Sequence, residues 1–356
     1  MNFENEILFY DDDVEFQEYL NYQRRPYTVR TRVDHFSTWD EQDFKNRFRL
    51  SKETVMMILN MIGPTISSNT DRNHAITPTQ KLLLALRFYA TGSFLISAGD
   101  VMGVSKSAAC VIVHDVSVAL AKLRPQIIKM PETNDEIKEL HKQFYGIAKF
   151  PLVIGAIDCT HIKIQSPGGP NAEYFRNRKG WFSLNVQTVV SPKLKIMDIV
   201  VRWPGSTHDS TIFSHSKINN DLHVTQNWGN SLIVANSGYA NTMHIVTPFL
   251  NPHVGPENLY NESQIRTRNP VERFYGVWKR RFPVLSLGMR LQISNIQTVI
   301  IACSVLHNIA IDCNEEMPMD DIQLPDELTE IMNAPIIENR QNNARTRLVN
   351  EYFSHI

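Results

Sequence analysis

The stretch PLVIGAIDCTHIKIQS, residues 151–166, decides the fold class of this chain. Its apolar run LVIGAI is short and ends on Asp158, which is typical of a buried strand, and HIKIQS continues it. Two further segments, FSLNVQTVVSP at 182–192 and KIMDIVVRWPG at 195–205, predict a second and a third strand that meet at a turn at Ser191-Pro192. The segment SLIVAN at 231–236 predicts a short fourth strand.

Helical segments around these strands complete an α/β fold. THDSTIFSHS at 207–216 begins a helix, and a loop rich in Pro, Asn and Gly is expected to run to about residue 267. NPVERFYGVWKRRF at 269–282 and SNIQTVIIACSVLHNIAI at 294–311 predict two closing helices. Together these elements indicate a mixed sheet flanked by helices. Polar residues interrupt the last segment, so we expect a buried core helix there and no membrane span.

An all-α region precedes the strands. WDEQDFKNRFRLSKETVMMILNMI at 39–62 offers Ser51 as a helix cap, and TPTQKLLLALRFYATG at 77–92 places Pro78 at a first helical position. The segment 93–123 then predicts two helices joined by a short turn at Gly103, and the run Val104-Ser105-Lys106-Ser107 opens the second helix. This is the helix-turn-helix pattern of DNA-binding proteins, although a purely structural helical hairpin gives the same pattern.

Composition and charge set the broad class of the protein. Of 356 residues, 42% are hydrophobic and 21% charged, which excludes a disordered or low-complexity chain. The four cysteines form no CxxC pair, so we expect neither a zinc knuckle nor a disulfide framework. The net charge of −1 conceals a basic middle, because residues 141–290 hold 17 basic and 8 acidic side chains between two acidic ends. That distribution favours a phosphate-binding body, although ordinary charge fluctuation is the alternative.

These patterns predict five successive regions. They are an acidic arm at 1–36, the helix-turn-helix region at 37–125, a linker helix at 126–149, the α/β domain at 150–312 and an acidic tail at 313–356.

Three acids follow or begin elements of the predicted α/β domain. Asp158 ends the first strand, Asp209 follows the third, and Glu272 lies near the start of a helix that places Arg268 and Lys279 on the same face. Carboxylates from separate elements that converge can bind Mg²⁺ and support phosphodiester cleavage. Taken singly, each acid also has a structural explanation, as a helix cap, a turn cap or a surface ion pair.

Two basic clusters are candidate contacts for DNA phosphates. Arg176, Arg178 and Lys179 alternate with aromatic residues, as in loops that bind nucleic acids, although a solvated turn with inward-packed aromatics is the alternative. The segment WKRRF at 278–282 contributes a second cluster. The complete set of candidate DNA-binding residues is Lys106, Arg176, Arg178, Lys179, Arg268, Lys279, Arg280 and Arg281.

The order of several motifs resembles Harbinger-type transposases and their domesticated nuclease relatives. GAIDCTHI at 155–162 is similar to the first-aspartate motif of that family, and PGSTHDSTIF at 204–213 is similar to its next block. NSGY at 236–239 followed by TPF at 247–249 resembles the third block. RNPVERFYGVWKRRFPVL at 268–285 resembles the glutamate block, and IIACSVLHNIA at 300–310 the closing helix.

The resemblance implies a ribonuclease-H-like fold and DDE chemistry with Mg²⁺ or Mn²⁺. Asp158 is then the first acid and Glu272 the last, with Arg268 and Lys279 as basic companions. Asp209 is a family-typical acid that can also reach the metal. The family's aspartate before SGY is Asn236 here, and 35 residues separate it from Glu272. The implied metal ligands are Asp158, Asp209, Asn236 and Glu272.

The resemblance also implies DNA as a partner, a separately encoded Myb-like DNA-binding protein, a homo-oligomer, and a location in nucleus and cytoplasm. We therefore expect a transposase-derived nuclease that hydrolyses DNA phosphodiester bonds with a divalent metal. The alternative is a weakened or inactive relative that acts as a DNA- or chromatin-binding protein, because an amide at 236 brings no charge to the metal. A helical-hairpin protein without any role on DNA is the third possibility.

Overall fold

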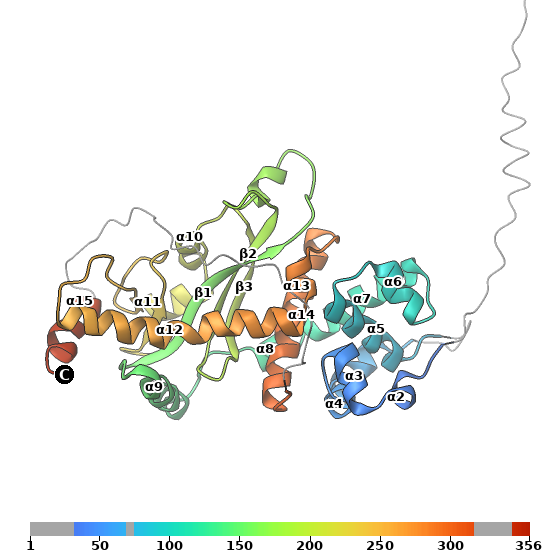
Figure 1. The fold of residues 1–356 in the computed structure, drawn as a ribbon, viewed down its shortest axis with the longest axis horizontal. Helices are drawn as coiled ribbons and strands as arrows, with labels where there is room; N and C mark the ends of the chain where they lie inside the picture. Colours follow the sequence, from blue (N-terminus) through green and yellow to red (C-terminus); the bar gives the residue numbers. More distant parts are fainter. Residues whose placement is uncertain (1–31, 69–74, 317–343) are drawn as a thin grey trace, which may run out of the picture.

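The computed structural model describes residues 32–68, 75–316 and 344–356 (Figure 1). The acidic arm up to residue 31 and residues 317–343 of the predicted tail lie outside these described ranges.

A five-stranded mixed sheet forms the centre of the molecule, in the strand order β3-β2-β1-β4-β5. β1 pairs antiparallel with β2, and β2 pairs antiparallel with β3. β4 runs parallel to β1, and β5 runs parallel to β4. The predicted α/β fold with a mixed sheet is confirmed, and so are its four predicted strands; the two-residue β5 was missed. The strands are β1 Val153–Lys163, β2 Ser183–Val190, β3 Ile196–Pro204, β4 Leu232–Ala235 and β5 Ile245–Val246.

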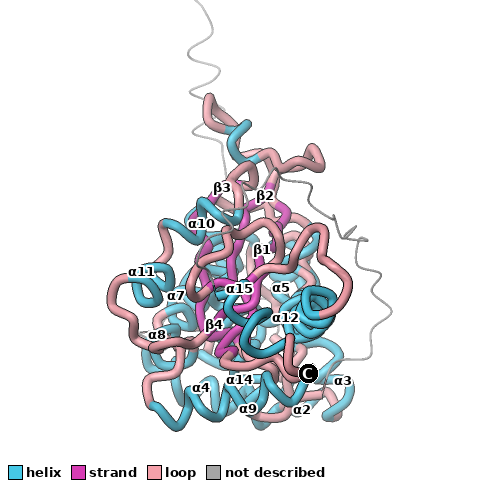
Figure 2. The backbone as a smooth tube through the Cα atoms, turned by 90° about the vertical axis from the view of Figure 1, so that its left-hand side faces the viewer, coloured by secondary structure: helices cyan, strands magenta, loops and turns pink. Residues whose placement is uncertain are grey.

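Helices cover both faces of the sheet because its strands are apolar on both sides (Figure 2). Ala156 and Ile162 of β1 belong to a large core that also contains α12, α14 and the N-terminal helices. Ile154 and Ile157 belong to a second core on the opposite face, with residues of α10 and α11. The helices of the α/β part are α9 Asn134–Ala148, α10 Asp209–Ser214, α11 Lys217–His223, α12 Pro256–Arg281, α13 Val284–Leu287 and α14 Ile293–Asp312.

The long helix α12 differs most from its prediction. It begins at Pro256, within the segment predicted as loop, and passes through Pro270, which was predicted to be near a helix start. A proline inside a helix removes one backbone hydrogen bond and costs about 3 kcal/mol. Burial of Tyr260, Gln264 and Thr267 in the preceding turns offsets that cost. Glu272 therefore lies in the middle of a 26-residue helix and not in its first turn.

The N-terminal helices lie beside α14 and share the large core with the sheet (Figure 1). Within them, α6 and α7 meet at an angle of 96° across a four-residue turn, and Ser105 caps α7. The angle and turn length fit a helix-turn-helix pair; its binding to DNA stays a prediction. The helices are α2 His35–Thr38, α3 Glu41–Phe48, α4 Lys52–Ile66, α5 Pro78–Thr91, α6 Leu95–Val101, α7 Lys106–Ala121 and α8 Arg124–Ile127.

Helix α14 is long and apolar enough to cross a membrane, but most of its residues are buried inside the protein. Asn308 explains why polar residues interrupt its apolar sequence. The Asn308 amide accepts from the backbone N–H of Ile196 at 2.8 Å and donates to the carbonyl of the same residue at 2.7 Å. The side chain thus joins α14 to the edge strand β3, as a core helix would.

The end of the chain returns to the α/β part. Helix α15, Ala344–Leu348, and the π-helical turn η2, Val349–Phe353, pack against the core. The ring of Phe353 lies 5.7 Å from that of Phe150 and 5.5 Å from that of Tyr260. Part of the predicted acidic tail is therefore built into the fold.

Candidate active site

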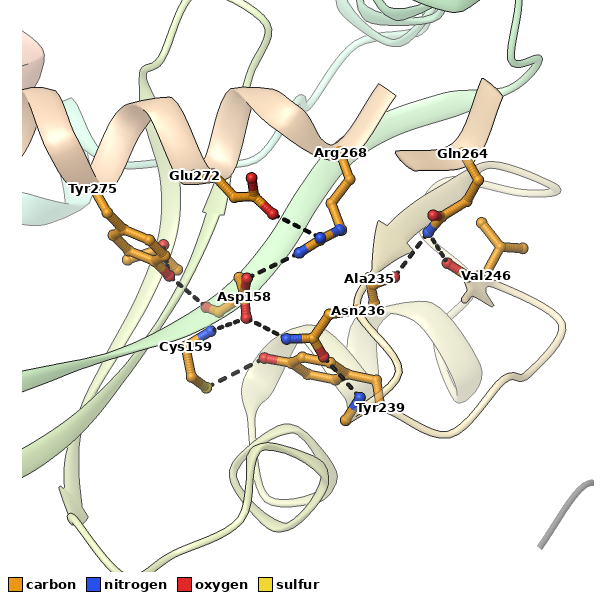
Figure 3. A network of polar contacts seen from close by, with 12 residues as sticks. Asp158, Cys159, Ala235, Asn236, Tyr239, Val246, Gln264, Arg268, Glu272 and Tyr275 are labelled. Carbon is orange, nitrogen blue, oxygen red and sulfur yellow. Dashed lines mark hydrogen bonds and ion pairs between the residues drawn. The ribbon is translucent and has the colours of Figure 1, made fainter. Parts of the chain in front are cut away.

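Asp158 is the centre of a polar network between β1 and α12 (Figure 3). Successive side chains of a strand point to opposite faces, so Asp158 faces α12 while Cys159 faces the second core. The side chain of Asp158 is 13% exposed, and its carboxylate accepts three hydrogen bonds. Its Oδ1 accepts from the backbone N–H of Cys159 at 2.8 Å and from Nδ2 of Asn236 at 2.7 Å, and its Oδ2 accepts from Arg268 at 3.2 Å.

Asn236 follows β4 and turns its amide nitrogen, not its oxygen, toward Asp158. Its Oδ1 accepts the backbone N–H of Gly238 at 2.8 Å. The two partners together fix this orientation, because the opposite one would place an oxygen against a carboxylate and an NH₂ against an N–H. Asn236 therefore donates a hydrogen bond to Asp158 in this arrangement, and its part as a metal ligand stays a prediction.

Arg268 bridges the first and last predicted acids. Besides Asp158, its guanidinium contacts Oε1 of Glu272 at 2.6 Å, one helical turn further along α12. The side chain of Arg268 is 15% exposed, whereas that of Glu272 is 44% exposed. The arginine thus places one positive charge between two carboxylates, in the position where a cation between them would have its strongest attraction.

Burial raises the pKa of Asp158 to about 7. The Arg268 charge acts in the opposite direction, and the charges of Asp209 and Glu272 add to the increase. The three predicted acids are therefore close enough to repel one another, and protonation of Asp158 relieves part of that repulsion.

Asp209 begins α10 and lies on the other side of β1. Its Oδ1 accepts from Nδ2 of Asn185 at 3.1 Å, and its carboxylate also contacts the thiol of Cys159. Burial raises the pKa of Asp209, while the Asn185 hydrogen bond lowers it. Burial likewise raises the pKa of the Cys159 thiol. The structure thus groups Asp158, Asn236, Arg268 and Glu272 directly, and Asp209 adjoins that group through Cys159.

Two residues that support the network were missed by sequence reasoning. Nε2 of Gln264 donates to the carbonyls of Ala235 at 2.8 Å and Val246 at 3.1 Å, which holds the ends of β4 and β5 together. The Tyr275 hydroxyl donates to the Asp158 carbonyl at 2.7 Å. Gln264 lies four and eight residues before Arg268 and Glu272, so it shares their helical face, but its segment was predicted to be a loop.

The predicted DNA-binding residues divide into exposed and buried groups. Lys279 is 3% exposed, and its ammonium donates to Thr160 Oγ1 at 2.7 Å. Arg281 is 1% exposed and donates to the carbonyls of Arg49 and Glu315. Both side chains face the interior, which argues against contact with phosphates, and their assignment to DNA binding stays a prediction. The side chains that are exposed are Lys106, Arg176, Arg178, Lys179 and Arg280, while Arg268 is partly buried.

The oxygen atoms that could bind metal in this arrangement do not complete a site for two divalent cations. Hard cations need several oxygen ligands, most of them anionic. Asp158 and Glu272 are separated by a guanidinium, and position 236 presents an NH₂ group. Within the described ranges, no three His, Cys, Asp or Glu side chains are grouped so that they could hold a metal ion.

The comparisons with known proteins agree on the family to which the chain is similar. A family model described as "DDE superfamily endonuclease" matches residues 157–308, the part that contains the whole network. Endonucleases of that superfamily generally use divalent metals. "Putative nuclease HARBI1" of Rattus norvegicus is 31% identical over 286 residues, which are 79% of this chain and 81% of the relative. The human protein of the same name is 30% identical over equal shares.

A plant relative extends this similarity. "Protein ALP1-like" of Arabidopsis thaliana is 24% identical over 302 residues, covering 79% of this chain and 73% of the relative. No solved structure matches the chain. The matched residues span the sheet, the acids of β1 and α12 and the closing helix α14. This chain therefore belongs to the Harbinger-type family of transposase-derived DDE endonucleases, together with HARBI1 and the ALP1-like proteins.

Proposed function

We propose that this protein is a DNA-binding member of its family whose DDE-type site hydrolyses phosphodiester bonds weakly or not at all. The observation that carries the proposal is the 2.7 Å hydrogen bond from the Asn236 amide to Asp158. A carboxylate in that position would add a negative ligand to the site, whereas the uncharged amide occupies one oxygen of Asp158 with a hydrogen bond. An amide in place of this carboxylate therefore weakens the attraction of the site for a divalent cation.

The position of Arg268 supports the same conclusion. A cation that approached Asp158 and Glu272 would have to displace a guanidinium that both acids already contact, at 3.2 and 2.6 Å. The contact with buried Asp158 contributes roughly 1.5–3 kcal/mol, and the contact with the exposed Glu272 roughly 0.2–0.5 kcal/mol. With one carboxylate fewer, the site has less to offer a metal in return.

Exposed basic residues support binding to DNA. Lys106 begins α7 of the helix-turn-helix pair, and Arg178 and Lys179 are exposed on the segment between β1 and β2. Residues 141–290 carry an excess of basic side chains. Binding that depends on phosphate contacts weakens steeply as salt rises.

Fluorescence anisotropy with a labelled DNA duplex over a series of salt concentrations tests the binding. Replacing Arg178 and Lys179 by Glu should lower the salt slope by about 1.8, at roughly 0.9 for each lost phosphate contact. Lys138→Glu is a matched control, because this lysine is 77% exposed on α9, away from both segments. An equal loss in the control, or binding that ignores salt, would contradict the proposal.

Plasmid nicking with Mg²⁺ or Mn²⁺ tests the hydrolysis. We expect the natural sequence to nick supercoiled DNA no faster than Asp158→Ala, and Asn236→Asp to gain metal-dependent nicking. Robust nicking by the natural sequence that Asp158→Ala abolishes would overturn the inactive assignment.

That result would establish the second candidate, a divalent-metal-dependent DNA endonuclease. One observation favours it, namely that Asp158, Asp209 and Glu272, from three different elements, are close enough to raise the pKa of Asp158 together.

The remaining expectations stay proposals. We propose a Myb-like DNA-binding partner, a homo-oligomer, and a location in both nucleus and cytoplasm, on the basis of family resemblance. Size-exclusion chromatography with light scattering measures the oligomeric state, and imaging of a tagged chain measures its location.

A further inference from the structure

The segment between β1 and β2 projects beyond the end of the sheet in both views (Figures 1 and 2). It contains the short helical turn η1, Ala172–Phe175, followed by a tight hairpin. A bridge between Arg176 and Phe182 closes the base of the hairpin, and Gly180 with φ +83° forms its tip beside Lys179. This backbone conformation is open to glycine at little cost.

Internal contacts hold this projection in one shape. The Arg176 guanidinium makes two contacts with Glu173, at 2.7 and 3.0 Å, and donates to the Gly180 carbonyl at 2.9 Å. It also lies over the ring of Phe182 at 4.4 Å. Arg176 was predicted to bind DNA, and these contacts give it a structural part in the hairpin. The residues at the tip are therefore ordered before any ligand arrives.

The projection is attached to the turn that leads into Asp209. The backbone N–H of Ser206 donates to the Tyr174 carbonyl at 3.0 Å. Gly205 approaches so closely that a Cβ there would lie 2.7 Å from the Phe175 carbonyl oxygen. Arg178 contacts the ring of His208, the residue before Asp209. Tyr174 and Arg178 thus flank the same turn, next to the candidate active site.

Tyr174 itself is exposed in a place where neighbouring rings are packed. It is 62% exposed, whereas Phe175, Trp181 and Phe182 are partly buried. An exposed aromatic ring beside ordered cations is the combination with which proteins bind single-stranded nucleic acids, since the ring stacks on a base and the cations contact its phosphates. The bases inside a duplex are already stacked on one another, whereas an unpaired base offers a free face on a flexible strand.

We propose that Tyr174, Arg178 and Lys179 form a platform that binds an unpaired nucleotide, so that the preferred ligand is duplex DNA with a single-stranded end. This proposal rests on the proposed function, because it assumes that the protein binds DNA. The platform then holds the unpaired base, while the basic body of the protein binds the adjoining duplex.

Fluorescence anisotropy with the full chain tests the proposal on two labelled duplexes of equal length, one blunt and one with a short single-stranded overhang. We expect tighter binding to the overhang duplex. Tyr174→Ala should lose about 5-fold or more of its affinity for that ligand, the range typical of one stacked base, and should keep its affinity for the blunt duplex. Tyr174→Phe keeps the ring and should bind as the natural sequence does.

Tyr145→Ala is the matched control, because Tyr145 is an exposed tyrosine on α9 and should not affect the preference. A 2-aminopurine placed in the overhang should lose fluorescence on binding to the natural sequence and lose less on binding to Tyr174→Ala. Equal affinity for both duplexes, or a preference that survives in Tyr174→Ala, overturns the platform while the proposed function stands. Failure to bind either duplex overturns the proposed function, and the platform with it.

Discussion

Replacing Asn236 by Asp puts a carboxylate where the amide now donates to Asp158 at 2.7 Å. The variant loses a hydrogen bond to a charged group, worth roughly 1.5–3 kcal/mol. Two carboxylates at this distance cannot both stay charged, so they share a proton. The pKa of Asp158 is already about 7, so at pH 8 uptake of that proton costs on the order of 1 kcal/mol. The shared proton restores one hydrogen bond in place of the lost one.

We therefore expect Asn236→Asp to destabilise the metal-free protein by about 2 kcal/mol at pH 8. With an unfolding entropy of roughly 0.7 kcal/mol/K for a chain of this length, the melting temperature in EDTA should fall by about 3 °C. A divalent cation at about 100 times its Kd would return roughly 2.7 kcal/mol to the variant. Mg²⁺ or Mn²⁺ should thus restore the variant and leave the natural sequence nearly unchanged.

Differential scanning fluorimetry with and without EDTA measures both effects. Asn308→Asp is a suitable control, because it also converts a buried amide to an acid, facing the carbonyls of Ile196 and Ile127. It should be destabilised without any rescue by metal. A strong response of the natural sequence to Mg²⁺, or an Asn236→Asp variant that is as stable in EDTA and unaffected by metal, would refute the reasoning that Asn236 keeps cations from the site.

Three further predictions concern the fold that holds the site. Burial lowers the pKa of His307 to about 4, while its Nε2 donates to the Leu194 carbonyl at 2.8 Å. The stability that neutral His307 contributes is thus present above pH 6.5 and lost as pH falls toward 4. Urea unfolding of the natural sequence should show a free energy of unfolding about 2 kcal/mol lower at pH 5 than at pH 7. This loss should be absent in His307→Gln. Gln264→Leu keeps the side-chain volume but removes two hydrogen bonds at the ends of β4 and β5. The free energy of unfolding in urea should therefore fall by about 2 kcal/mol or more. An unchanged urea midpoint would contradict a positioning role for Gln264. Phe353→Ala removes the ring that packs on Phe150 and Tyr260. Limited proteolysis of the variant should then cleave the C-terminal segment before the rest of the protein. Equal cleavage of that segment in the natural sequence and the variant would be the contrary result.

Local pattern was enough for four strands of the sheet and for several helix starts. The apolar run before Asp158 predicted β1, and Ser51 and Pro78 marked the starts of α4 and α5 because caps and prolines act within one turn. The acids Asp158 and Glu272 were predicted from their places at element ends and from the resemblance. The start of α12 was predicted wrongly because Pro270 argues locally for a helix start, whereas the burial of Tyr260 and Gln264 depends on strands that lie elsewhere in the sequence.

The sequence by itself determined the α/β class, because this follows from residue type and local periodicity. It also pointed to the acids and to the amide at position 236, through their places at element ends and through the family resemblance. Only the tertiary structure decided which atoms meet. It turned the Asn236 nitrogen toward Asp158, set Arg268 between Asp158 and Glu272, and buried Lys279 and Arg281 against backbone carbonyls. Most of these contacts join residues more than 75 positions apart in the sequence. Which side chains meet across such a separation depends on how the sheet and helices pack, and a local sequence pattern contains no information on that packing.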